Sequence, residues 1–360
     1  MSAYTSLRRI FITYRKMERK IYFVHNWVHD IPSFLQYIDL NLEPGIKLLW
    51  DESCPEILFA TDNIYTSRKC NDDFRKLYNK AKIIVYFGSE ASFVDFNLFD
   101  YGVGFDNTIK SERYIQLPVE RFFKKMFKEE PISSDELSLL ESGGGKFCNF
   151  MYSNPNAHPV RDQLFYAISK YKRVDSLGSH LNNTGLGGTG FVGHYDDMVN
   201  LKRGYRFSIA CENSKFPGYT SEKIYTSLNA RTVPIYWGNP DIELEINPQC
   251  FINCMKLGNM ENVVNEIKRI DNDRELWLQM VKCPWHTPEQ TKYLAERSAH
   301  YDAFFNKILS YPIDTLKQRR IGTYQHYYRT WFLQTKIDDS IMARIRRKLF
   351  CPSDNQVKEI

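Results

Sequence analysis

The sequence lacks the long apolar runs that cross a bilayer, because no stretch approaches about 18 consecutive apolar residues. The segment IYFVHNWVHD, which follows a basic N-terminal region, is too short and too polar for the core of a signal peptide. The eight cysteines are scattered singly with no Cys-x-x-Cys pair, a pattern typical of a reduced cytosolic chain. We therefore expect a cytoplasmic protein.

The charge excess is also small. A net charge of +5 on 360 residues falls short of what a dedicated nucleic-acid-binding protein carries, so we expect no nucleic-acid partner. The aromatic content of 15% is high, and such side chains suit both cores and carbohydrate stacking. A chain of this length predicts two domains of roughly 150 residues each.

Short apolar runs alternate with helical patterns in the first half of the chain. The runs KIYFVHNWV, KLLW and EILFATD precede a helical segment, DDFRKLYNKA, and a further run, KIIVYFGSEAS. This alternation predicts an α/β sheet. The Ser-rich and Gly-rich segment ISSDELSLLESGGGKF then interrupts it, and we interpret that segment as an interdomain linker.

The α/β pattern restarts after the linker, so a second sheet is expected. FCNFMYS, KRVDSLG, YRFSIACEN and TVPIYWGNP read as strands, and VRDQLFYAISKY and SEKIYTSLNA read as helices. We predict an α/β domain over residues 1–145 and another over 146–314, facing each other across a cleft at the carboxyl ends of their strands. The Gly/Asn-rich segment 179–193 is either a loop near a ligand or a plain surface loop.

Residues 315–360 have a different character. The segment 316–350 holds nine Lys or Arg and two Asp, interleaved with Tyr, Trp and Phe. Ile341, Ile345 and Leu349 share one face of a predicted basic amphipathic helix. Such a helix fits peripheral attachment to an anionic membrane, and it equally fits a terminal helix packed on the protein; an RNA-binding tail is a third option.

The stretch ACENSKFPGYTSEKIY, residues 210–225, gathers polar side chains where a predicted strand gives way to a helix. Gly218 permits a sharp turn, and Thr220 or Ser221 can cap the helix. A helix N-terminus attracts anions, and Lys223 adds a full positive charge there. Glu222 would repel a phosphate but can accept hydrogen bonds from sugar hydroxyls. The combination indicates a nucleotide sugar, although a plain capped helix has the same local pattern.

Three segments resemble the α-1,3/4-fucosyltransferase family, in particular its bacterial members, which invert the anomeric centre and use GDP-fucose. They are FNLFDYGVGFD at 96–106, SNPNAHPVRDQLFYAI at 153–168, and FSIACENSKFPGYTSEKIYTSLNARTVPIYWGNP at 207–240. The resemblance implies a GT-B-like fold of two Rossmann-like domains, with the donor held by residues 146–314. Ser221 replaces the threonine of the family pattern and keeps the hydroxyl.

The resemblance also implies roles for individual residues. Arg161 and Lys223 would contact the diphosphate, Glu222 the ribose, and Asn213 and Tyr219 the rest of the donor. Cationic side chains and helix dipoles can stabilise the departing diphosphate without a general acid. We also expect the chain to lack the Asp-x-Asp motif that binds a metal-bound diphosphate in the other main glycosyltransferase architecture, and we therefore expect no cofactor and no required metal ion.

The acceptor hydroxyl needs a general base on the opposite face of the sugar. Glu90 is the only glutamate between residues 80 and 110, and its position after a predicted strand matches the catalytic glutamate of the family. Because the alignment is loose here, Asp95 remains a rival. His25 and His158 are given no role.

The expected activity is the transfer of L-fucose, with inversion, to the 3- or 4-hydroxyl of GlcNAc, or the 3-hydroxyl of glucose, in a β-galactoside acceptor. N-acetyllactosamine and lactose are the expected acceptor units, in Lewis-type glycans assembled on a lipid carrier or lipopolysaccharide. Two alternatives stay open: a related nucleotide-sugar glycosyltransferase with another acceptor, and a non-catalytic protein that binds glycans or nucleic acid.

Overall fold

The computed structural model describes residues 17–122, 128–142, 145–186, 195–319 and 322–334. Its contacts divide the chain into two compact units. Of the described residues, unit 1 holds 17–86, 96–101 and 302–334, and unit 2 holds 87–95 and 102–301. The chain therefore leaves unit 1 and returns to it near its C-terminal end. How the units face each other, predicted as a cleft, stays a prediction.

The first sheet has six strands in the order β2-β1-β3-β4-β5-β6. They are β1 (Met17–Val24), β2 (Ile46–Trp50), β3 (Ile57–Thr61), β4 (Ile83–Phe87), β5 (Tyr101–Gly104) and β6 (Tyr114–Gln116). The registers described, β1 with β2 and β3, and β5 with β6, are all parallel. Strands β3 and β4 are buried throughout, as expected of parallel strands covered on both faces. The helices of this part of the chain are α1 (Ile31–Ile38), α2 (Asn63–Thr66), α3 (Arg68–Tyr78) and α4 (Val119–Phe122).

A late segment of the chain completes unit 1. It contains the C-terminal part of α12 (Pro288–Ser310), then α13 (Ile313–Leu316) and α14 (Thr323–Gln334). Phe305 stacks on Phe59 of β3 with ring centroids 6.2 Å apart. The buried carboxylate of Asp100 accepts the backbone N–H groups of Gln318 (2.9 Å) and Arg319 (2.8 Å), and it pairs with the Arg319 guanidinium at 2.7 Å. Residues just beyond the predicted boundary at 315 thus belong to the interior of unit 1.

The second sheet lies in unit 2 and has the order β11-β10-β9-β7-β8. Its strands are β7 (Lys146–Phe150), β8 (Val174–Ser176), β9 (Tyr205–Cys211), β10 (Val233–Trp237) and β11 (Ile252–Asn253), and all of them pair in parallel. From β7 the chain builds outward first to β8 and then, on the other side, to β9. The strand order therefore reverses between β7 and β9, and such a switch point is where open α/β sheets bind ligands.

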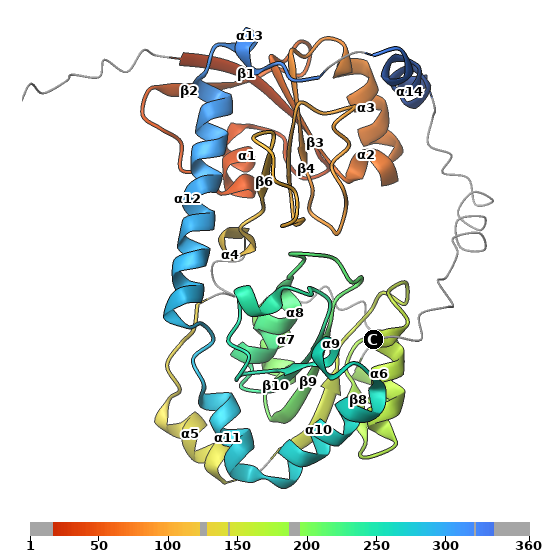
Figure 1. The fold of residues 1–360 in the computed structure, drawn as a ribbon, viewed down its shortest axis with the longest axis vertical. Coiled ribbons are helices and arrows are strands. Elements are labelled where there is room, and N and C mark those ends of the chain that lie inside the picture. The colour runs from red at the N-terminus through yellow and green to blue at the C-terminus, as the bar shows by residue number, and fades with distance from the viewer. Residues whose placement is uncertain (1–16, 123–127, 143–144, 187–194, 320–321, 335–360) are drawn as a thin grey trace, which may run out of the picture. The chain divides into compact units, whose positions relative to one another are not determined.

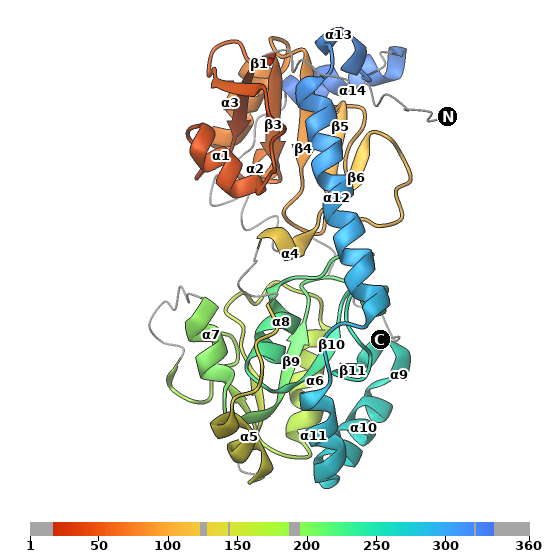
Figure 2. The same cartoon turned by 90° about the vertical axis from the view of Figure 1, so that its left-hand side faces the viewer.

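Helices cover both faces of this second sheet, because successive side chains of a strand point in opposite directions. Phe207 and Ile209 of β9 join the core beneath α6 (Val160–Ser169), α10 (Met260–Asn272) and α11 (Arg274–Lys282), whereas Ala210 joins the core beneath α8 (Glu222–Asn229). Helix α7 (Tyr195–Lys202) packs against α8. Figure 2 shows α7 and α8 on one side of the sheet and α9 (Cys254–Leu257) and α10 on the other.

The predicted alternation of strands and helices is confirmed in both halves of the chain. The predicted linker contains a short helix, α5 (Ser134–Glu141). Ser133 and Glu136 form a capping box at its N-terminus. Gly143, Gly144 and the predicted amphipathic segment 335–360 lie outside the described residues. Within the described residues, no helix has both the length and the hydropathy needed to cross a bilayer.

Candidate functional site

A pocket of about 270 Å³ opens at the carboxyl ends of β7, β8 and β9, at the switch point of the second sheet. We call it the switch-point pocket. Its lining residues come from the loops after these strands and from α6, α7 and α8: Met151, Tyr152, Ser153, Asn154, Arg161, Gly178, Met198, Lys202, Asn213, Glu222, Lys223 and Thr226. The volume is just below the range of about 300–1,000 Å³ typical of small-molecule sites.

The junction between β9 and α8 forms one wall of this pocket. Glu212 directly follows β9 and is fully buried. Its carboxylate accepts hydrogen bonds from the backbone N–H of Ser221 (2.9 Å) and from the Ser221 hydroxyl (2.6 Å). Ser221 is the N-cap residue of α8, but its hydroxyl makes no capping bond to the helix. The strand end and the helix start are therefore joined through a buried carboxylate.

Two glycines permit close packing around this junction. Gly238, after β10, has φ 154°, and a Cβ there would lie 2.3 Å from Cγ of Glu212. Gly218 has φ 74°, and a Cβ there would lie 2.1 Å from the carbonyl oxygen of Phe105. The buried amide of Asn239 fixes the turn, because it accepts the N–H of Gly218 (2.8 Å) and donates to the Thr220 hydroxyl (3.0 Å). Only glycine fits the two tight positions.

Lys223 lies between two carboxylates. Its Nζ is 3.3 Å from Glu212 and 3.3 Å from Glu222, and it donates to the Ser221 hydroxyl at 2.9 Å. Burial would lower the pKa of Lys223, but the charges of Glu222 and Glu212 raise it above its usual value. Burial raises the pKa of Glu212, while the charge of Lys223 opposes that shift. For Glu222, Lys223 and nearby hydrogen bonds outweigh burial and lower the pKa.

Arg161 lines the pocket from the first turn of α6. Its side chain is 1% exposed, and its guanidinium lies over the ring of Tyr152, 4.5 Å from the centroid. One terminal nitrogen donates to the carbonyl of Asn154, whereas the buried Nε makes no hydrogen bond within the described residues and lies 3.8 Å from the Asp162 carboxylate. Tyr152 in turn bonds to the end of β9, because its hydroxyl accepts the N–H of Cys211 at 2.6 Å. Arg161 is thus held in place, and its Nε–H group can still donate a hydrogen bond to a ligand.

The structure brings together four of the six predicted site residues. Arg161, Asn213, Glu222 and Lys223 all line the switch-point pocket. Tyr219 does not line it: the side chain is buried, and its ring contacts Phe105 edge-on at 4.8 Å. The roles inferred from the family resemblance stay predictions.

The sixth residue, the predicted base Glu90, pairs with Tyr219. Glu90 is exposed in the loop after β4, and its Oε2 accepts the Tyr219 hydroxyl at 2.9 Å. Burial, with the charges of Glu212 and Glu90, raises the pKa of Tyr219 far above its usual value, so this hydroxyl stays protonated. The rival Asp95 is half-buried.

Lys202, which the sequence analysis missed, also lines the pocket. It ends α7 and is 5% exposed. No local signal singles it out, because a basic residue in the last turn is common in helices. Only the packing of α7 on α8 reveals its position.

The described residues contain no cluster of three or more His, Cys, Asp or Glu that could hold a metal ion. One Asp-x-Asp sequence, Asp271-Asn272-Asp273, does occur, so the expectation that the chain lacks this motif is wrong. Asp271 pairs with Arg206 and Lys172, and Asp273 caps α11 through the N–H of Leu276. Both carboxylates therefore have structural partners.

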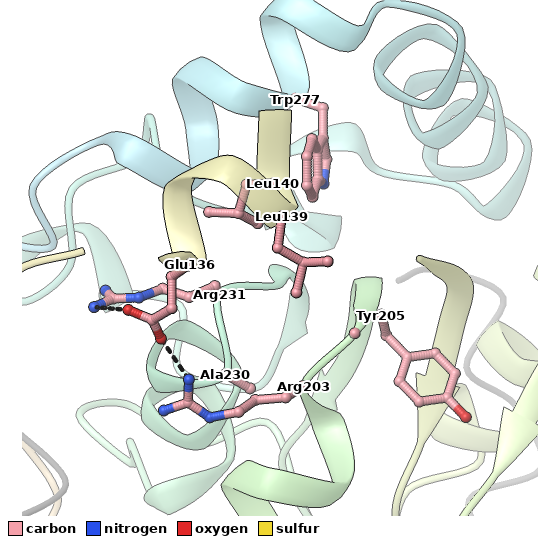
Figure 3. Close-up of a pocket in the computed structure, with 9 residues that line it drawn as sticks. Glu136, Leu139, Leu140, Arg203, Tyr205, Ala230, Arg231 and Trp277 are labelled. Atoms are coloured by element: carbon pink, nitrogen blue, oxygen red, sulfur yellow. Dashed lines mark hydrogen bonds and ion pairs between the residues drawn. The ribbon is translucent and has the colours of Figure 1, made fainter. Parts of the chain in front are cut away.

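A second pocket lies beneath α5 (Figure 3) and is lined by Leu139, Leu140 and Trp277 together with an ionic cluster. In that cluster Glu136 pairs with Arg203 and Arg231. Its volume of about 70 Å³ is far too small for a nucleotide sugar.

The Gly/Asn-rich segment is partly described. Gly178, which directly precedes it, lines the switch-point pocket. Asn182 donates to the carbonyl of Gly178 (2.7 Å) and Asn183 to that of Val174 (2.9 Å), so this part is a turn bonded to β8. Residues 187–193 lie outside the described residues, and closure over a ligand stays a prediction.

Solved structures share this fold. A crystal structure of an alpha1,3-fucosyltransferase aligns with a TM-score of 0.65 and 23% identity, covering 88% of this chain and 96% of that one. A crystal structure of alpha1,3-fucosyltransferase with GDP-fucose aligns with a TM-score of 0.62 and 23% identity, covering 86% and 94%. The predicted fold class, GT-B with two Rossmann-like parallel sheets, is confirmed.

Curated relatives show sequence similarity as well. The chain is 28% identical over 268 residues to the alpha-(1,3)-fucosyltransferase FucT of Helicobacter pylori, which covers 65% of this chain and 52% of that protein. It is 26% identical over 135 residues to an alpha-(1,4)-fucosyltransferase of Arabidopsis thaliana, which covers 34% of each chain. The aligned part thus spans about half of the first relative and a third of the second.

A family model also matches the sequence. Residues 144–331 match the model described as glycosyltransferase family 10 (fucosyltransferase) C-term. This range includes the whole switch-point pocket and just over half of the chain. The predicted family is therefore confirmed: the chain belongs to glycosyltransferase family 10, the fucosyltransferases.

Proposed function

We propose that this protein is an α-1,3- or α-1,4-fucosyltransferase that uses GDP-fucose. It transfers L-fucose with inversion to GlcNAc, or to glucose, of a β-galactoside-containing glycan. The observation that carries the proposal is the convergence of Arg161, Lys223 and the N-terminus of α8 on a pocket at the switch point of the second sheet. A neutral glycan has no need of such an anion site, whereas a nucleoside diphosphate does.

The leaving group is stabilised at this pocket. As the bond between fucose C1 and the diphosphate oxygen breaks, its electron pair and the resulting negative charge go to GDP. Arg161, whose buried Nε makes no hydrogen bond within the described residues, and Lys223 stabilise that charge. Glu222, half-exposed beside Lys223, accepts hydrogen bonds from the ribose hydroxyls, and Asn213 and Tyr219 hold the rest of the donor.

The acceptor is activated by Glu90. Its carboxylate takes the proton from the attacking hydroxyl while the oxygen bonds to C1 on the face opposite GDP, which inverts the configuration. Two observations support this role: Glu90 is exposed, and Tyr219, from the loop that also carries Asn213, donates to it. Asp95, a half-buried rival, is the second candidate base.

Acceptors of the N-acetyllactosamine or lactose type, as in Lewis antigens and lipopolysaccharide, complete the proposal. Support comes from the two curated relatives, which are named as an alpha-(1,3)- and an alpha-(1,4)-fucosyltransferase. We place the protein in the cytoplasm, in peripheral contact with an anionic membrane. The basic tail supports that contact, as do the exposed aromatic side chains Tyr324, Tyr327 and Trp331 on α14.

The direct test is GDP release from GDP-fucose with N-acetyllactosamine, its type 1 isomer and lactose. Wild-type protein is compared with Lys223→Ala and with the surface control Lys256→Ala, whose side chain is 68% exposed. We expect turnover with at least one acceptor and loss of GDP-fucose affinity only in Lys223→Ala. Binding of GDP-fucose without turnover on any acceptor would favour a related transferase with another acceptor, and no binding at all would favour a non-catalytic protein.

We also propose that the reaction needs no metal ion, because the side chains of the pocket supply the positive charge. The same assay after EDTA treatment tests this. Activity should persist within about twofold; a loss that Mg²⁺ or Mn²⁺ restores would refute it.

A further inference from the structure

Lys202 is a buried lysine with an unusual set of partners. Its Nζ donates to two hydroxyls of α8, that of Thr226 at 2.7 Å and that of Ser227 at 3.3 Å. Within the described residues it forms no ion pair, although it is only 5% exposed. Buried lysines are rare unless they are paired, so this amine stands out.

The charges around the switch-point pocket show what Lys202 adds. The pocket is lined by the cations Arg161, Lys202 and Lys223 and by the carboxylate Glu222. Glu212 lies buried against Lys223, and the Asp162 carboxylate lies 3.8 Å from Nε of Arg161. Without Lys202, two cations face three carboxylates. With Lys202 protonated, the charges of these groups balance.

We propose that Lys202 is a further binding residue for the donor's diphosphate, and that it offsets the excess negative charge of these carboxylates. This inference rests on the proposed function, since it assigns the diphosphate of GDP-fucose to the same pocket. Thr226 also lines the pocket, so the lysine and its hydroxyl partner lie together at the wall that a phosphate would contact.

Lys202 should take up a proton when a diphosphate binds. Burial lowers the pKa of Lys202 to about 7; the charge of Glu222 opposes this shift and that of Lys223 adds to it. These two residues on α8, and Arg161 on α6, are the charged groups that face it across the pocket. At pH 8 the free amine is therefore about 90% neutral, and a bound diphosphate favours its charged form. GDP should bind with uptake of close to one proton.

The experiment is GDP binding by isothermal titration calorimetry at pH 8, in buffers of different ionisation enthalpy, which yields both affinity and proton uptake. A terminal phosphate with a pKa of about 6 is fully ionised at this pH. Lys202→Met should bind GDP about ten- to a hundredfold more weakly and without the proton uptake. Lys202→Arg, permanently charged, should keep most of the affinity and also lose the uptake. The exposed control Lys256→Met should match wild type.

The outcomes distinguish failure of the proposed function from failure of the role given to Lys202. If wild type does not bind GDP, the proposed function and this inference both fail. If wild type binds GDP but Lys202→Met shows the same affinity and uptake, only the inference fails. Circular dichroism identifies a variant that does not fold. In that case wild type alone decides: uptake should be close to one proton at pH 8 and small at pH 6, and its absence at pH 8 overturns the proposal.

Discussion

Glu212 and Ser221, both buried, are joined by two hydrogen bonds, one from the Ser221 backbone at 2.9 Å and one from its hydroxyl at 2.6 Å. The two residues are nine positions apart, at the end of β9 and the start of α8. This contact fixes where α8 begins, and with it the position of Lys223. Buried polar groups of this kind are costly to leave unpaired.

Removing the Glu212 carboxylate should therefore destabilise unit 2. In Glu212→Ala the buried N–H of Ser221 loses its acceptor and Lys223 loses an ion-pair partner, so we expect a loss of about 3–5 kcal/mol in the free energy of unfolding. Urea denaturation followed by circular dichroism measures this. Glu261→Ala, at an exposed position on α10, is the control and should change stability by less than about 0.5 kcal/mol. Equal stability of the two variants would contradict the role given to Glu212.

The buried amine of Lys202 should make stability depend on pH. Its pKa is about 7 in the folded chain and 10.5 in the reference state, so between these values the unfolded chain binds a proton that the folded chain lacks. The free energy of unfolding of wild type should therefore rise with pH across this window, relative to Lys202→Met, by roughly 1 kcal/mol per pH unit. Below pH 7 Lys202 is charged in both states, so the full free-energy cost of burying its charge is present. Urea denaturation of both proteins at pH 7, 8 and 9 tests this; a constant difference between them would refute it.

Gly238 should not tolerate a methyl group. Its φ is 154°, and an added Cβ would lie only 2.3 Å from Cγ of Glu212, so Gly238→Ala should lose roughly 2–4 kcal/mol. The comparison is Gly258→Ala, where φ is 78° but no atom lies within 4 Å. In that variant the free energy of unfolding should fall only by the cost of a left-handed backbone conformation for alanine, about 1–2 kcal/mol. Thermal unfolding should rank the two in this order, and the reverse order would show that the contact with Glu212 is unimportant.

Substitutions of Glu90 and of Tyr219 can be distinguished by their effects on kcat and KM. If Glu90 is the base, Glu90→Gln lowers kcat by about 10²–10⁴-fold with little change in KM for GDP-fucose. Tyr219→Phe removes the hydroxyl that donates to Glu90: a fall in kcat alone would assign it to positioning the base, and a rise in KM alone to holding the donor. Tyr166→Phe, 55% exposed on α6, is the matched control. Full activity of Glu90→Gln with loss in Asp95→Asn would transfer the role to Asp95.

Strands β1 to β4 and β7 to β10 could be predicted because parallel strands buried on both faces read as apolar runs, whereas the short strands β5, β6 and β11 were not predicted. The run that became β10 is buried at all of its positions, for example. The return of the chain to unit 1 could not be predicted in this way. Nothing in the local pattern of residues 302–319 says that Arg319 will pair with Asp100, because that partner is set by tertiary packing.

The candidate site shows the same division. Gly218 and Lys223 could be placed at a turn and at a helix start from the sequence alone. The sequence does not predict that the neighbouring residues Glu212 and Asn213 differ in position. Glu212 is buried against Ser221, whereas Asn213 lines the pocket. Lys202 was missed because it joins the pocket only through the contact between α7 and α8.

The pairing of Asp100 with Arg319 also bears on how the chain is made. Asp100 accepts the backbone N–H of a residue 219 positions later, and the whole of the second sheet is encoded between them. A ribosome therefore releases the strands of unit 1 first but the segment that satisfies their buried carboxylate last. Unit 1 therefore cannot complete its fold until the rest of the protein has been synthesised. The unit whose strands leave the ribosome first is completed last.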